Sequence, residues 1–499
     1  MWERFSFYGM KYLLLLYLTK YHLFTDAMGL DVLGSYAALV YSTPVIGGLL
    51  ADRYLGMRKA VIFGGCLLVL GHLGMAVEGQ PAQHLNNGIV RDDQALQIFY
   101  FSIALIIVGV GFLKPNISTI VGKLYGENDP RRDSGFTIFY MGINIGAFIA
   151  TLLCGYLGET LGWRYGFGAA GIGMLIGLVI FLFGQRYLHN HAEPSDLAKL
   201  KEPISPRLGG LYLNRECLIY IGGLISVVGI WQLVQATHWV EWSLNGLSIV
   251  VATGILWFIL TRCNTVERGR MSVLMVLTFS TVVFWALFEQ TAASMTLYAD
   301  RVVDRELLGL EIKASQFGAL NPMFIMLLAP LFALLWTGLS KRKCEPATPT
   351  KFSLGIIQAG LGFGALVIGA YFPNESGKVA AIWLILAYLL HTTGELCLSP
   401  VGLSAVTKLS VPRIVGVMMG TWFLATAYSE FMAAQIAKLA AIDMPSTTGP
   451  DSGNGQIDTI TILSNYTDLF TTLFWVGCGA GILLLCLSPY LKRHMHGIQ

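Results

Sequence analysis

Apolar stretches long enough to cross a lipid bilayer recur along the whole chain. A helix needs about 20 apolar residues to span a hydrocarbon core. The composition agrees, since 55% of the 499 residues are hydrophobic and 13% are charged, whereas soluble proteins carry about 25% charged residues. The chain is therefore predicted to be an all-α polytopic membrane protein. Its 14 predicted transmembrane helices lie near 2–21, 34–52, 59–77, 97–122, 135–157, 164–185, 217–236, 244–261, 272–292, 315–339, 352–371, 378–400, 414–440 and 466–491.

Two polar stretches, 186–216 and 262–271, divide these segments into groups of six, two and six. This order predicts two six-helix bundles with an inserted helix pair, an arrangement typical of transporters built from repeated bundles. The predicted domains are an N-terminal bundle at 1–187, a linker with two extra helices at 188–271 and a C-terminal bundle at 272–499.

Basic residues gather in alternate loops, and such loops face the cytoplasm. Both termini are therefore predicted to be cytoplasmic. The basic residues on this side include Arg53, Arg58, Lys59, Arg131, Arg132, Lys341, Arg342, Lys343, Lys492 and Arg493.

The composition also argues against several other classes of protein. The eight cysteines are scattered and form neither a CxxC pair nor a cluster with histidine, so neither a metal site nor a disulfide framework is expected. The net charge of +3 is too small to indicate nucleic-acid binding. Glu3 and Arg4 lead directly into an apolar run, which does not resemble a signal peptide. This abrupt start predicts that native residues precede Met1.

The first predicted helix contains charges that are expensive in a bilayer. Arg4, Tyr8 and Lys11 are spaced by four and three residues, so they share one face of a helix. A charge near the bilayer centre costs roughly 2.5–3.5 kcal/mol on insertion scales. This face is therefore expected to line a polar cavity inside a bundle, with Glu3 beside Arg4. The alternative is that the first turn is solvated and that Lys11 reaches the membrane surface.

Other polar and aromatic residues interrupt later apolar segments. A lone asparagine or tryptophan in such a place is more often a packing or interfacial residue, so these residues gain meaning only as a set. They are Lys114, Tyr140, Asn144, Trp285, Glu289, Asn321, Glu395, Ser399 and Trp422.

The charges in these segments differ in sign between the bundles. Arg4, Lys11 and Lys114 make the first interior positive, whereas Glu289 and Glu395 make the second negative. Cations on one wall and carboxylates on the other suit a zwitterion such as an amino acid or a short peptide. Aromatic side chains would supply apolar walls, and buried carboxylates are natural proton carriers. These aromatic residues are Tyr8, Tyr41, Trp285 and Trp422.

Other functions remain open at this point. A proton symporter for nitrate or an amino acid would use similar charges. A membrane-embedded enzyme or a receptor is the alternative from another class. An enzyme would need a nucleophile–base pair or metal ligands, and the nine histidines do not cluster. His391, near Glu395, is the one histidine that suggests a role, and packing or pore lining explains it as well.

The loop after the second segment reads GLLADRYLGMRK. It resembles the GxxADRxxGxRK motif of the major facilitator superfamily, which acts in conformational gating. Glycines allow helix ends to approach closely, and the aspartate can pair with basic neighbours. The alternative is an ordinary basic cytoplasmic loop. The motif residues are Gly48, Asp52, Arg53, Gly56, Arg58 and Lys59.

Six further motifs, in order, resemble those of the proton-coupled oligopeptide transporters from end to end. They are WERFSFYG, GFLKPNIS, FYMGINIGAFIA, FWALFEQ, GELCLSPVGLS and MMGTWFLATA. The extra helix pair is typical of bacterial members. The resemblance implies a major facilitator fold and inward co-transport of protons with di- and tripeptides by alternating access. We therefore expect a monomer in the bacterial cytoplasmic (inner) membrane, with protons as coupling ion, no other cofactor and no enzymatic activity.

The resemblance also implies roles for individual residues. Lys11 would pair with Glu289, and Lys114 would face Glu395. With Glu3 and Arg4, these four form the expected proton-coupling set. The peptide site is expected to comprise Arg4, Tyr8, Lys11, Tyr41, Lys114, Tyr140, Asn144, Trp285, Glu289, Asn321, Glu395, Ser399 and Trp422.

Three features depart from the family pattern. The first glutamate of the ExxERFxYYG signature would precede Met1 and is absent from this sequence. Phe7 replaces the first tyrosine of the YYG triplet and so removes a hydroxyl. Glu430 lies in an otherwise apolar segment and has no assigned role.

Overall fold

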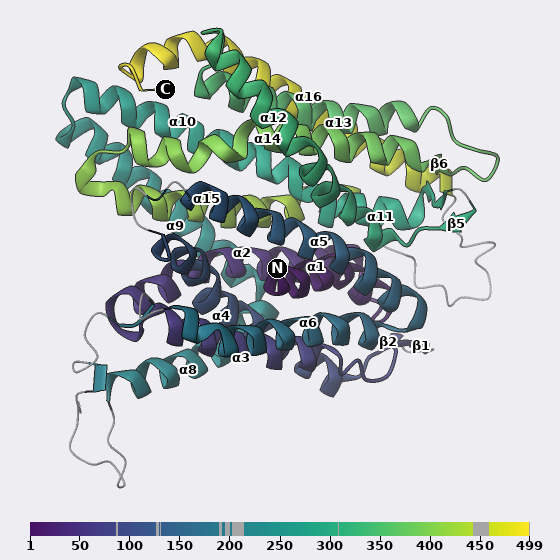
Figure 1. Ribbon diagram of the computed structural model, residues 1–499. Helices are drawn as coiled ribbons and strands as arrows, with labels where there is room; N and C mark the ends of the chain where they lie inside the picture. The colour runs from purple at the N-terminus through teal and green to yellow at the C-terminus, as the bar shows by residue number, and fades with distance from the viewer. Residues whose placement is uncertain are drawn as a thin grey trace. The chain divides into compact units, whose positions relative to one another are not determined.

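The computed structural model (Figure 1) describes residues 1–85, 88–125, 129, 131–188, 192–194, 200–201, 214–307, 309–442 and 459–498. These residues form 14 long helices and one short helix, α11 (Ser294–Arg301), which continues α10 through a 3₁₀ turn. The long helices are α1 (Trp2–Lys20), α2 (Asp26–Leu50), α3 (Met57–Met75), α4 (Asp93–Lys123), α5 (Arg132–Leu161), α6 (Trp163–Gly184), α8 (Arg215–Gln235), α9 (Thr237–Arg262), α10 (Thr265–Phe288), α12 (Leu320–Lys341), α13 (Thr348–Gly369), α14 (Ala381–Leu409), α15 (Val415–Ala437) and α16 (Thr459–His494).

Twelve helical segments of the described chain are long and apolar enough to cross a membrane. The helices α1 and α15 are not among them, because they carry charged residues in their interiors. In α1 these are Glu3, Arg4 and Lys11, and in α15 it is Glu430. The charges that make these two helices weak membrane segments are thus the ones that need partners inside the protein.

Local sequence signals explain where several helices begin and end. The side chain of Asn264 accepts a hydrogen bond from the backbone amide of Glu267, and the carboxylate of Glu267 accepts one from the backbone amide of Asn264. This capping box starts α10. Asp92 caps α4 by accepting from the amide of Ala95 at 3.0 Å. Gly162 separates α5 from α6 with a φ of 127°, a conformation that favours glycine.

The chain divides into two compact units. The first consists mainly of Met1–Tyr17, Ser35–Leu85 and Ile89–Val240, and the second mainly of Leu18–Gly34 and Glu241–Gln499. Helix α8 therefore belongs to the first unit and most of α9 to the second. The three-part boundaries predicted from the sequence stay a prediction, and residues 189–191, 195–199 and 202–213 of the predicted linker lie outside the described residues.

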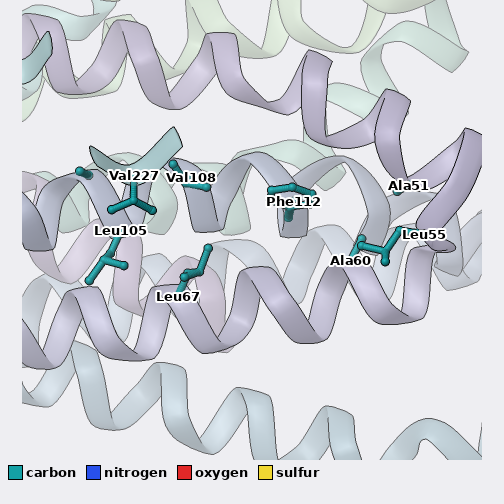
Figure 2. Packing of buried hydrophobic residues seen from close by; sticks show 9 residues of the cluster. Ala51, Leu55, Ala60, Leu67, Leu105, Val108, Phe112 and Val227 are labelled. Carbon is teal, nitrogen blue, oxygen red and sulfur yellow. The ribbon is translucent and has the colours of Figure 1, made fainter. Parts of the chain in front are cut away.

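In the first unit, α3 packs along α4 and α6, and α8 packs on α4. Figure 2 shows Leu67, Leu105, Val108 and Val227 packed together. Val227 comes from α8, so the first helix of the inserted pair contributes directly to this core. Between membrane-spanning helices, such packing stabilises the unit through van der Waals contact rather than through exclusion of water.

In the second unit, α13 packs against both α14 and α16, α10 against α15, and α12 against α14. Short strands lie between the helices. Strand β3 (Val303–Asp304) pairs in parallel with β6 (Val379–Ala380), and β4 (Glu306–Leu307) pairs antiparallel with β5 (Leu310–Glu311). In the first unit, β1 (Gln83–Leu85) pairs with β2 (Gly88–Val90), whose first residue is assigned to the second unit.

We expect Gly64→Val to destabilise the first unit. A Cβ atom on Gly64 would lie 2.5 Å from the carbonyl oxygen of Gly109, so α3 and α4 would have to separate. Overpacking of this kind typically costs about 1–3 kcal/mol. Heating the detergent-solubilised variant and measuring the surviving monodisperse peak by gel filtration would reveal a lower melting temperature. Gly229→Val on α8 is the matched control, because nothing lies within 4 Å of its Cβ position. Equal melting temperatures for the two variants would contradict the expectation.

Candidate functional site

In the first unit, the start of α1 holds a buried ion pair. The Nε of Arg4 donates to Oε2 of Glu3 at 2.7 Å, and the two side chains are only 11% and 15% exposed. The guanidinium of Arg4 also lies over the ring of Phe7, 5.3 Å from its centroid. Glu3 and Arg4, which are neighbours in the sequence, therefore form an ion pair in the structure.

Aromatic rings accompany the two lysines of this unit. Lys11 is 3% exposed, and its Nζ lies 5.8 Å from the centroid of Phe7. The Nζ of Lys114 on α4 lies 3.7 Å from the ring centroid of Tyr41 on α2. A cation over a ring face is stabilised by about 0.5–2 kcal/mol. Phe7, which departs from the family signature, therefore lies within 6 Å of two cations.

Three other predicted residues of this unit lie on α1 and α5. Tyr8 stacks on Tyr12 with ring centroids 6.4 Å apart. Asn144 is buried and donates from Nδ2 to the backbone oxygen of Tyr140 at 3.0 Å. The side chain of Tyr140 is 43% exposed. The two predicted residues on α5, Tyr140 and Asn144, are therefore linked by a hydrogen bond to the Tyr140 backbone and not by contact between their side chains' polar groups.

The predicted gating loop begins with a π-helical turn, Ala51–Leu55, which contains Asp52 and Arg53. Gly56 follows with a φ of 79°, and this left-handed conformation suits glycine. A Cβ atom on Gly48 would lie 3.3 Å from Pro115 on α4. The glycines of the motif thus permit a tight turn at Gly56 and a close helix contact at Gly48.

The basic residues at the end of this loop bind carboxylates of the first unit. Arg58 donates from Nε to Oε1 of Glu193 at 2.5 Å and from a terminal nitrogen to Gln185 at 2.7 Å. Lys59 contacts Glu216, in the first turn of α8, at 2.6 Å. Sequence reasoning missed both acids. Little in the sequence distinguishes Glu193 and Glu216, because both lie in the polar stretch 186–216, which was interpreted only as a linker.

In the second unit, a hydrogen-bonded network surrounds Glu395 on α14. Asn321 on α12 donates from Nδ2 to Oε2 of Glu395 at 2.9 Å and to Oγ1 of Thr392 at 3.2 Å. Glu395 is 9% exposed and Thr392 is fully buried. Two predicted residues, Asn321 and Glu395, are therefore brought together, and Thr392 joins them without having been predicted.

The other predicted residues of the second unit lie on α10, in the 3₁₀ turn that follows it (Glu289–Ala292), on α14 and on α15. Trp285 packs edge-on against Phe288, 5.2 Å between ring centroids. Glu289 is partly buried and close enough to Glu395 for the two to interact electrostatically. Trp422 is 8% exposed, and its ring lies 2.6 Å from the Cβ position of Gly402. Ser399 is exposed. Glu430, which had no assigned role, is 5% exposed.

A second group of charges, missed by the sequence reasoning, lies where α2 begins and α11 ends. Both terminal nitrogens of Arg301 donate to Asp26 at 2.6 Å, and the side chains are 14% and 3% exposed. Asp26 also accepts from the amide of Ile442 at 3.0 Å. Asp31 on α2 pairs similarly with Lys438. The sequence shows acidic residues near Arg301, but Asp26 is far from it along the chain, so the pairing could not be predicted.

Within the described ranges, no group of three or more histidine, cysteine, aspartate or glutamate side chains could hold a metal ion. The site chemistry in this part of the chain therefore consists of carboxylates, cations, hydroxyls and aromatic faces.

Asp26→Asn should destabilise the second unit, because it leaves the Arg301 guanidinium buried without its carboxylate. Removing one partner of a buried pair typically costs about 3–5 kcal/mol. A thiol-reactive dye can follow unfolding on heating, since Cys397 and Cys478 of this unit are buried free thiols, and it should react at lower temperature in the variant.

The matched control is Asp129→Asn. Arg131 donates to Asp129 and holds the pKa of that carboxyl below its usual range, but the Arg131 side chain is 80% exposed. This substitution should leave the dye reaction unchanged. A shift as large as that of Asp26→Asn would show that burial does not distinguish the two pairs.

Comparisons with known proteins agree with this geometry. The model of the POT family (PTR2) matches residues 58–449. The chain is 37% identical to the peptide transporter YePEPT of Yersinia enterocolitica, over 90% of this chain and 88% of that protein. It is 34% identical to a di-/tripeptide transporter of Lactococcus lactis, over 88% and 87%.

A solved structure supports the fold. The crystal structure of a mutant POT peptide transporter in complex with alafosfalin has a TM-score of 0.78 and 32% identity, covering 99% of this chain and 94% of that one. The predicted major facilitator fold, with its inserted helix pair, is thereby confirmed. The chain is a multi-pass membrane protein, and it belongs to the POT family of transporters.

Proposed function

We propose that the chain imports di- and tripeptides together with protons across the bacterial cytoplasmic membrane, by alternating access and with both termini in the cytoplasm. The carrying observation is the contrast in charge between the units. The first gathers Arg4, Lys11 and Lys114 beside aromatic rings, whereas the second buries Glu395 and partly buries Glu289. The peptide substrates named for the similar transporters support this proposal.

The chemistry of a peptide fits these two interiors. Its carboxylate is attracted by fixed cations and its ammonium group by carboxylates. Trp285 and Trp422 offer apolar surface to side chains of different shape. A carboxylate can also be neutralised by a proton, whereas an arginine keeps its charge at any relevant pH. Glu289 and Glu395 are therefore the proposed proton carriers of the second unit.

Lys11–Glu289 and Lys114–Glu395 join residues of different units, and these pairings stay predictions. We also propose that the protein works as a monomer in the lipid bilayer, with protons as coupling ion and no other cofactor, and that it transports rather than catalyses. The making and breaking of these two pairs would accompany each change of access.

The first test is uptake of labelled dialanine into proteoliposomes under an inward proton gradient. Lys114→Ala and Glu395→Gln should each lower the rate about tenfold or more, because loss of a buried charge partner costs well over the ~1.4 kcal/mol of one decade. Lys341→Ala is the control, since Lys341 is exposed at the end of α12. Near-normal uptake by both variants would refute the role of these charges. Uptake of labelled nitrate instead of dipeptide would favour the alternative symporter.

The second test concerns Glu3. Its Oε2 accepts from Arg4, while Oε1 is buried without a hydrogen-bond partner among the described residues, so protonation could relieve a poorly solvated charge. Glu3→Gln mimics the protonated state permanently. Uptake driven by a pH gradient should fail, whereas peptide-for-peptide counterflow should persist because it needs no net proton movement.

Glu306→Gln, at an exposed position in β4, should retain both activities. If Glu3→Gln still concentrates peptide in response to the pH gradient, Glu3 is only a structural partner of Arg4.

A further inference from the structure

Asn321 binds two acceptors that lie three residues apart on α14. Its Nδ2 donates to Oε2 of Glu395 at 2.9 Å and to Oγ1 of Thr392 at 3.2 Å. Residues i and i+3 share a helix face, so one amide group from α12 reaches both. The two hydrogens of the amide nitrogen are thus committed to α14.

Thr392 decides which end of this amide faces Glu395. Its hydroxyl donates to the backbone oxygen of Tyr388 at 2.7 Å, so the oxygen can only accept from Asn321. An amide turned by 180° would place its own oxygen against the Thr392 oxygen, with no hydrogen between them. Thr392 therefore favours the orientation in which Asn321 donates to the carboxylate.

We propose that Thr392 is a positioning residue for proton coupling, which acts through Asn321 to stabilise the ionised form of Glu395. A donor aimed at a carboxylate favours its charged form. Protonated Glu395 could instead donate to the amide oxygen, and Thr392 opposes that rearrangement. The proposal rests on the proposed function, in which Glu395 carries a coupling proton.

Other ionisable groups lie on α14 and on the elements that pack against it. Glu289 lies in the turn after α10 and interacts electrostatically with Glu395. His391 precedes it by one helical turn and is hydrogen-bonded through Nε2 to the Ala359 oxygen of α13. Groups on this and the neighbouring elements include Cys397 on α14, Lys351 on α13, which pairs with Glu345, and buried Glu430 on α15. None of these contacts changes directly when the Thr392 hydroxyl is removed.

Thr392→Val keeps the branched shape but removes the acceptor. Asn321 can then turn, and ionised Glu395 loses a fixed donor. A hydrogen bond of ordinary strength corresponds to a shift of about half a pH unit to one unit. The pH at which gradient-driven dialanine uptake falls to half should rise by this amount, because Glu395 takes up its proton more readily.

Two variants serve as controls for the uptake profile. Thr393→Val makes the same change at the next residue, whose hydroxyl donates only to the Leu390 oxygen of its own helix. The pH at which uptake falls to half should be the same in this variant as in wild type. Thr392→Ser restores the hydroxyl and should return the profile towards wild type. A shift in Thr393→Val as large as that in Thr392→Val would overturn the proposal.

A double variant tests whether Thr392 acts through Asn321. Asn321→Ala removes the donor and should shift the profile in the same direction. Adding Thr392→Val to Asn321→Ala should then change nothing further. A second shift of full size in the double variant would mean that Thr392 acts by another route.

Infrared titration of the purified protein separates this proposal from the proposed function. It follows the carboxylic-acid band of Glu395, identified by its loss in Glu395→Gln, without any transport. The midpoint should rise in Thr392→Val and not in Thr393→Val, and identical midpoints would overturn the proposal. If the midpoints differ as expected but wild-type proteoliposomes take up no peptide, the proposed function fails while the positioning role stands.

Discussion

A charge buried in an apolar interior must find a partner there, and much of this structure follows from that constraint. The two units meet it differently. In the first, aromatic rings lie beside Arg4, Lys11 and Lys114, and Arg4 also pairs with Glu3. A ring face lowers the cost of burying a cation and leaves its charge in place. In the second, the amide of Asn321 binds Glu395. A neutral donor likewise stabilises the carboxylate and leaves its charge in place.

Asp26 and Arg301 show the opposite solution. Their two parallel hydrogen bonds cancel both charges locally, and this fork-like geometry is the strongest available to the pair. A pair so matched has little tendency to bind a third group. The matched pair is therefore better suited to hold helices together than to attract a zwitterion or exchange a proton.

Sequence reasoning reached the helices and the sign of each interior because both depend on local pattern. Apolar length marks a membrane segment, and a lysine such as Lys114 is conspicuous within one. It did not reach Asp26–Arg301 or Arg58–Glu193, since these partners are far apart in the chain and ordinary in their local setting. Thr392 was missed for another reason. Threonine is unremarkable in an apolar helix, and only its distance to Asn321 gives it a role.

The inserted helix pair matters because the charged residues of the gating loop need partners as well. Arg58 and Lys59 end the gating loop, and their acids are Glu193, in the segment after α6, and Glu216, on α8. These acids lie outside the six helices of the predicted first bundle. Val227 anchors α8 in the hydrophobic core between α3 and α4, so the position of Glu216 is fixed by packing rather than by charge alone. The conformation of the loop therefore depends on α8, and this first helix of the inserted pair is part of the first unit's structure rather than an appendage to it.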